Sequence, residues 1–152
     1  MKAIRNLSLS LLTVLLLTAT TFARTENGEF DNTSKDKFPV IEANLLVGLH
    51  SDNEGLRISS AYYLGELKSQ KAVHQLMSIL RDDESYPARI VAALSLIKIG
   101  DPQGVYMVQR TSLFNTQEGV RKMSERFYLS YLFKKYLEQH PEKTNDLAYI
   151  KF

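Results

Sequence analysis

The chain has 152 residues, the size of a single domain, and its 44% hydrophobic and 24% charged residues are typical of a folded protein. It contains no cysteine, which excludes disulfide bonds and cysteine-ligated metals. Lys2 and Arg5 lie in a predicted signal peptide, and the rest of the chain holds 17 basic and 17 acidic residues. A chain without basic excess gives no basis for binding to nucleic acid or to an anionic membrane surface.

Residues 1–23 have the pattern of a cleavable signal peptide: a basic start, an uncharged leucine-rich stretch, and small residues just before a cleavage site after Ala23. The alternative is an uncleaved membrane anchor, which needs about 20 predominantly apolar residues, whereas Ser and Thr interrupt this stretch. Residues 24–37 contain one aromatic and no aliphatic residue, so we predict a disordered leader. We therefore expect a secreted or periplasmic protein that leaves the membrane after signal cleavage.

The remaining chain contains an internal repeat. Arg57, Arg89 and Arg121 recur every 32 residues, and Leu64 aligns with Leu96 at the same spacing. Such self-similarity is the mark of a repeat architecture, in which each unit buries its apolar face against its neighbours.

Each aligned segment has the same predicted elements around it. An apolar stripe at helical spacing precedes a polar, acid-containing turn, and a second helical stripe follows the turn. The first stripes span residues 41–49, 73–80 and 105–112, and the turns span residues 51–54, 82–85 and 115–118. We predict an all-α fold over residues 38–140, a short α-solenoid of about three antiparallel helix pairs.

The repeat resembles a known family. The Leu-Gly-Glu-Leu stretch ending at Leu67, the Ile-Gly-Asp-Pro stretch ending at Pro102, the arginine register and the acidic turns are similar to HEAT repeats of the short, lyase-type bacterial kind. The resemblance covers roughly residues 38–134, and it implies an α-solenoid that binds other proteins. In the lyase-type family, pigment attachment needs specific partners, and nothing in this chain supplies them. The resemblance therefore implies no pigment-attaching activity.

The third repeat departs from this pattern. Its second helix is long and aromatic, as expected of a C-terminal cap that covers the open end of the core; the alternative is that these aromatic side chains form a binding groove. Pro141 is expected to end the helix, and residues 141–152 form a predicted C-terminal tail. The aromatic residues are Phe127, Tyr128, Tyr131, Phe133 and Tyr136.

No catalytic, metal or cofactor motif is found in the sequence. His50, His74 and His140 are far apart and share no metal-binding spacing. The acidic run at residues 82–84 lacks the glycine and the distal glutamate of a calcium loop and suits a helix cap instead. We therefore expect no cofactor and no enzymatic activity, and we keep an enzyme of unknown type as a minor alternative.

The repeated arginines are predicted to have a structural role. A cation near a helix N-terminus is disfavoured by the helix dipole, so each arginine needs a stabilising partner. The acidic turns supply candidates: Asp52 or Asp83 for Arg89, and Asp83 or Glu118 for Arg121, with Arg57 in the same register. The alternative is a solvent-facing arginine whose aliphatic stem covers the core.

Six residues are predicted to form a partner-binding strip, because they lie a half-turn away from the core stripe of each second helix. The outward strip mixes aromatic, aliphatic and charged side chains of types that interfaces favour; the alternative is an ordinary surface with scattered apolar residues. It consists of Tyr62, Glu66, Leu94, Lys98, Met123 and Arg126.

These patterns favour a binding role over catalysis. We predict an exported, non-catalytic scaffold module that docks another exported or envelope protein, without binding nucleic acid. The alternative is a structural subunit that self-associates into a homo-oligomer through the ends of the solenoid.

Overall fold

The computed structural model describes residues 32–143. The predicted signal peptide, the first part of the predicted leader and the tail from residue 144 onward lie outside the described residues. The chain divides into two compact units, one up to Ile41 and one from Glu42 onward. In the first unit the described residues are helical from Asn32, so the predicted disordered leader is wrong from residue 32 to 37. A polar segment forms helical turns when it extends a helix that is already nucleated.

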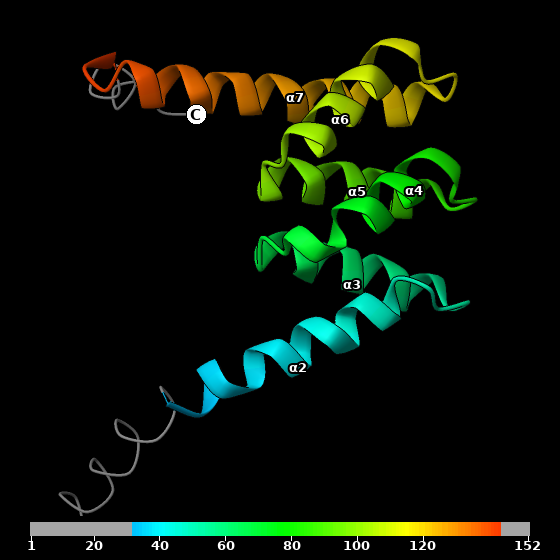
Figure 1. Cartoon of the computed structure of the whole chain (residues 1–152). Helices are drawn as coiled ribbons and strands as arrows, with labels where there is room; N and C mark the ends of the chain where they lie inside the picture. The colour runs from blue at the N-terminus through cyan, green and yellow to red at the C-terminus, as the bar shows by residue number, and fades with distance from the viewer. Residues whose placement is uncertain (1–31, 144–152) are drawn as a thin grey trace, which may run out of the picture. The chain divides into compact units, whose positions relative to one another are not determined.

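The described part of the chain is all-helical. Seven elements follow one another, and the turns between them are short, so neighbouring helices run antiparallel (Figure 1). They are α2 (Asn32–Gly48), α3 (Glu54–Glu66), the 3-10 turn η1 (Gln70–Ala72), α4 (Val73–Asp82), α5 (Tyr86–Ile99), α6 (Pro102–Phe114) and α7 (Glu118–Gln139). The second unit thus contains three helix pairs: the end of α2 with α3, α4 with α5, and α6 with α7.

The turns inside the pairs repeat the same geometry at the predicted spacing of 32 residues. Ser51, Asp83 and Asn115 each accept a hydrogen bond from the backbone N–H two residues further on, at 3.1, 2.8 and 3.0 Å. The helix that follows is capped by Asn53 in the first pair and by Ser85 in the second. These side-chain oxygens satisfy N–H groups that the helix start leaves without partners.

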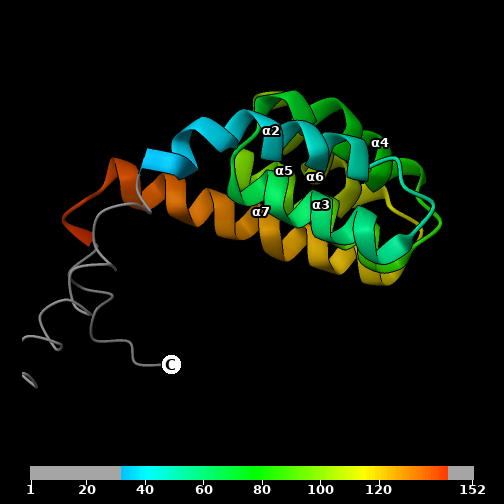
Figure 2. The same cartoon turned by 90° about the horizontal axis from the view of Figure 1, so that it is seen from below.

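The second helices of the pairs, α3, α5 and α7, pack against one another in series, with α5 in the middle (Figures 1 and 2). On α5, Ala92, Ala93, Leu96 and Ile99 are buried. On α3, Leu56 lies in the first turn of the helix and is 50% exposed. None of the helices formed by residues 32–143 is long and apolar enough to cross a membrane. The fully buried large side chains of the core include Leu64, Leu76, Leu80, Leu96, Val108 and Val120.

Helices α3 and α5 approach closely at Gly65. A Cβ atom placed on this glycine would lie 2.8 Å from the Cα of Ser95, closer than real contacts allow. Ser95 is buried, and its hydroxyl donates a 2.7 Å hydrogen bond to the carbonyl of Ala61, one turn earlier on α3. Small residues therefore set the distance between these two helices, and the serine hydroxyl is satisfied across the contact.

Arg57 joins the first pair to the second. Its guanidinium donates to both carboxylate oxygens of Asp83, at 3.0 and 3.1 Å, and to the backbone carbonyls of Ser51 and Asp52. Burial by itself would raise the pKa of Asp83, but the hydrogen bonds from Arg57 and from the Ser85 N–H outweigh it, so the pKa lies below its usual value. Asp52 thus contributes its backbone carbonyl to this contact rather than its carboxylate.

The other two arginines differ from our prediction. The guanidinium of Arg89 donates to the carbonyl of Leu80 at 2.9 Å and to the side-chain oxygen of Gln117 at 2.6 Å. Its charge contributes to the lowered pKa of Asp83, but it forms no ion pair with Asp52 or Asp83. Arg57 and Arg89 each contact the turn of the next helix pair. Arg57 binds the carboxylate of Asp83, and Arg89 binds the side-chain amide of Gln117.

Arg121 belongs to the last helix pair, so no following turn is present among residues 32–143 for it to reach. Within these residues it forms no ion pair, and Glu118 pairs with Lys122 instead, at 2.6 Å. The predicted pairing of Arg121 with Asp83 or Glu118 is therefore wrong, because the arginine contact points forward along the solenoid.

Candidate protein-binding surface

The outward strip crosses the three second helices in order. Tyr62 and Glu66 lie on α3, Leu94 and Lys98 on α5, and the last two residues on α7. The residues on α3 are exposed, those on α5 are half-buried, and on α7 Met123 is half-buried while Arg126 is exposed. The middle row is less exposed because α5 is flanked on both sides by helices.

Three residues of the strip interact directly. The ammonium group of Lys98 on α5 pairs with the Glu66 carboxylate on α3 and lies 4.6 Å from the centre of the Tyr62 ring. Hydrogen bonds from Lys98 and from Tyr62 lower the pKa of Glu66, and the bond to Glu66 raises the pKa of the Tyr62 hydroxyl. The cluster therefore holds an aromatic ring, a cation and an anion in fixed relation on the surface.

The rest of the strip is not tied to this cluster. Within the described part of the chain, no hydrogen bond or ion pair links Arg126 to Tyr62, Glu66 or Lys98. Leu94 on α5 and Met123 on α7 add half-buried apolar surface to the strip. The structure thus brings three of the six predicted residues together and leaves Arg126 at the far side of the strip.

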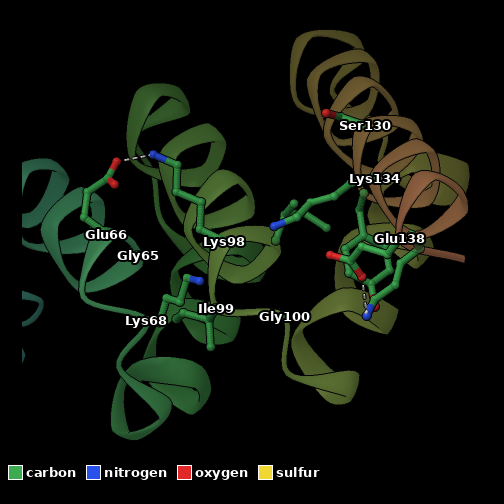
Figure 3. A pocket seen from close by; sticks show the side chains of 12 residues that line it. Gly65, Glu66, Lys68, Lys98, Ile99, Gly100, Ser130, Lys134 and Glu138 are labelled. Atoms are coloured by element: carbon green, nitrogen blue, oxygen red, sulfur yellow. Dashed lines mark hydrogen bonds and ion pairs between the residues drawn. The ribbon is translucent and has the colours of Figure 1, made fainter. Parts of the chain in front are cut away.

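A cavity of about 450 Å³ lies next to the cluster and was not predicted (Figure 3). It forms where α3 and α5 end, at Glu66 and Ile99, while α7 continues to Gln139 and provides the opposite wall. We call it the lysine pocket, because four of its lining residues are lysines. Its lining residues are Gly65, Glu66, Lys68, Ile97, Lys98, Ile99, Gly100, Ser130, Tyr131, Lys134, Lys135 and Glu138.

The charges of the lysine pocket do not balance. Lys98 pairs with Glu66, and Lys135 pairs with Glu138 at 3.3 Å. The side-chain ammonium groups of Lys68 and Lys134 have no hydrogen-bond or ion-pair partner within residues 32–143. Two unbalanced positive charges therefore line this cavity.

Two sequence signals could have revealed the pocket. The 32-residue alignment pairs Lys68 with Gly100, which places a lysine where the next repeat ends its helix with glycine. The uninterrupted helical pattern up to Pro141 also indicates that α7 is longer than the two second helices before it. Of the residues that line the pocket, the outward register of the second helices identifies only Glu66 and Lys98.

Two of the histidines share a smaller cavity. His50 and His74 line a cavity of about 290 Å³ together with Gln75, whose buried side-chain oxygen has no hydrogen-bond partner. The described residues contain no group of three or more His, Cys, Asp or Glu side chains that could hold a metal ion. His140 lies elsewhere, stacked on the ring of Tyr136.

The stack of antiparallel helix pairs, with turns and arginine contacts repeated along it, defines a short α-solenoid. A family model for HEAT repeats matches residues 42–124, more than half of the chain, and the chain therefore belongs to the HEAT-repeat family. No curated protein matches the chain in a sequence comparison. HEAT repeats suggest a protein-interaction or scaffold role, and their family is typically non-catalytic.

Proposed function

We propose that this HEAT-repeat protein is an exported, non-catalytic module that docks another exported or envelope protein along the outward strip. The observation that carries the proposal is the cluster of Tyr62, Glu66 and Lys98. Its members are held in place by one another, so little side-chain entropy is lost when a partner binds. Tyrosine and arginine are also the residue types that dominate interface energetics.

Export is part of this proposal, and it rests on the pattern of residues 1–23. When the chain is expressed with its own N-terminus, we expect a mature protein that begins at Arg24, because the small residues before it suit signal peptidase. Intact-mass measurement of the exported fraction checks this. A full-length species in the membrane fraction would support the uncleaved anchor instead.

The outward strip is tested by replacing one residue at each of its ends. We expect the pair Tyr62→Ala with Arg126→Glu to reduce partner capture about tenfold, because it removes the exposed ring of the cluster and reverses the charge at the far side. The measurement is quantitative mass spectrometry of proteins captured from an envelope extract by the tagged mature chain.

A matched control is available on α6, where Tyr106 and Arg110 are both exposed. The pair Tyr106→Ala with Arg110→Glu makes the same chemical changes away from the strip and should leave capture unchanged. Circular dichroism must show the same helix content for both variants. Wild-type capture by the strip variant would show that the partner docks elsewhere.

A second candidate function, a self-associating subunit, is favoured by the outer face of α6. Tyr106, Leu113 and Phe114 are 63%, 61% and 74% exposed there, opposite the face that α6 buries. In a longer solenoid a further helix pair would cover such a face. Light scattering on the same three samples separates the two functions: a concentration-dependent mass that the α6 control variant abolishes would support self-association.

A further inference from the structure

The lysine pocket carries an inference about the chemistry of the partner. It adjoins the outward strip, since Glu66 and Lys98 belong to both. Figure 3 shows that its cationic side chains come from different segments, Lys68 from the turn after α3 and Lys134 from α7. The pocket is therefore built by three helices that are far apart in sequence, and it exists only in the folded solenoid.

The backbone at Lys68 is a second, independent observation. Lys68 has a φ angle of +52°, and it is the only residue other than glycine with a positive φ in the described part of the chain. The equivalent residue of the next repeat is Gly100, with a φ angle of +75°. Glycine adopts this conformation without steric cost, whereas any residue with a Cβ atom is strained in it. A lysine in this place costs stability, and strained residues of this kind cluster at functional sites.

Helix dipoles do not neutralise the pocket. The C-terminal ends of α3 and α5 each carry about half a unit of negative charge, which makes about one unit together. The side chains contribute four positive and two negative charges, so the sum remains positive. Lys68 and Lys98 are stabilised by these helix ends, but Lys134 lies on a helix that continues beyond it.

The other lining residues are two glycines, Ser130, and three residues that add apolar or aromatic surface: Ile97, Ile99 and Tyr131. A ligand that fits both the unpaired lysines and the apolar surface has carboxylates separated by apolar side chains. We propose that the lysine pocket binds an acidic, amphipathic segment of the partner protein, with its carboxylates at Lys68 and Lys134. This inference rests on the proposed function. An acidic protein segment fits better than nucleic acid, because the mature chain has no basic excess outside the pocket.

The test uses a fluorescein-labelled peptide of about ten residues in which glutamate alternates with leucine, and a counterpart with glutamine in place of glutamate. Anisotropy titration of the purified full chain should show binding of the glutamate peptide, and binding should weaken about tenfold or more with the glutamine peptide. Binding should also weaken as salt increases, because the contact is between charges. Equal binding of both peptides would overturn the proposal.

Two variants and one control locate the site. Lys68→Gly and Lys134→Gln should each weaken binding of the glutamate peptide about fivefold, while Lys122→Gln should not, because Lys122 pairs with Glu118 in the first turn of α7. Lys68→Gly should also melt at the same or a higher temperature than the wild type, since glycine relieves the strain. Loss of binding with retained stability distinguishes a ligand contact from a structural one.

The outcomes separate this inference from the function on which it rests. Unchanged peptide binding in both lysine variants would overturn the lysine pocket, even if partner capture still depends on Tyr62 and Arg126. Labelled oligodeoxythymidine serves as a further probe, and if it binds as tightly as the glutamate peptide, the ligand is nucleic acid and the proposal is wrong. Lysine-dependent peptide binding that oligodeoxythymidine does not match supports it.

Discussion

Replacing Gly65 with alanine is expected to lower the free energy of unfolding by about 2 kcal/mol. The added Cβ would lie 2.8 Å from the Cα of Ser95 and 2.6 Å from its hydroxyl oxygen. The clash is with backbone, and α5 cannot move away because it is packed between α3, α4 and α7. Overpacking of this kind costs about 1–3 kcal/mol or more, and the better helix propensity of alanine returns at most about 1 kcal/mol. Urea denaturation followed by circular dichroism measures the difference.

Gly119 provides the matched control. It lies in the first turn of α7, and a Cβ there would meet only the ring of Tyr86, at an ordinary contact distance of 3.5 Å. Gly119→Ala should therefore be neutral or slightly stabilising. A Gly65→Ala protein as stable as the wild type would show that α3 and α5 separate at little cost and that glycine is not what sets their distance.

The period of 32 residues was enough to predict the helix pairs, because apolar periodicity and capping residues act locally. It was not enough to identify the partner of each arginine. Arg57 and Arg89 occupy the same register, yet Arg57 contacts the carboxylate of Asp83 and Arg89 contacts the side-chain amide of Gln117. The residue equivalent to Asp83 in the third pair is Asn115, so Arg89 makes its contact two residues further along the turn. Which neighbouring turn an arginine reaches depends on how the pairs stack, and stacking is a tertiary property.

The candidate site shows the same limit. Glu66 and Lys98 could be predicted, because the outward register of a single helix identifies them. The lysine pocket depends on where α3 and α5 end relative to α7, which is decided by the packing of three helices. The leader boundary was misplaced for a related reason: composition identifies residues that do not bury apolar surface, but such residues still form a helix next to one that is already nucleated.

Replacing Asp83 with asparagine at neutral pH is expected to lower the free energy of unfolding by about 2 kcal/mol. The Asp83 side chain is 8% exposed and that of Arg57 is 18% exposed, so the pair is shielded from water. Loss of the carboxylate leaves the guanidinium with two backbone carbonyls only, and a charge-assisted hydrogen bond in such a setting contributes about 1.5–3 kcal/mol. Asparagine should preserve the turn, because Asn115 occupies the equivalent position in the third helix pair and accepts the N–H of Gln117 there, as Asp83 accepts that of Ser85.

The pH dependence of this effect tests its electrostatic origin. The pKa of Asp83 is lowered by folding, so its stabilising contribution is complete above the unfolded value of about 4 and is lost as the pH falls through the folded value. The stability difference between wild type and Asp83→Asn should therefore be constant from about pH 5 to 7 and should shrink towards about pH 3. Asp52→Asn, which removes an exposed carboxylate that forms no ion pair, should change stability by less than about 0.5 kcal/mol at each pH. If the Asp83→Asn difference is the same at about pH 3 as at pH 7, the ion pair with Arg57 is not what stabilises the junction between the first two helix pairs.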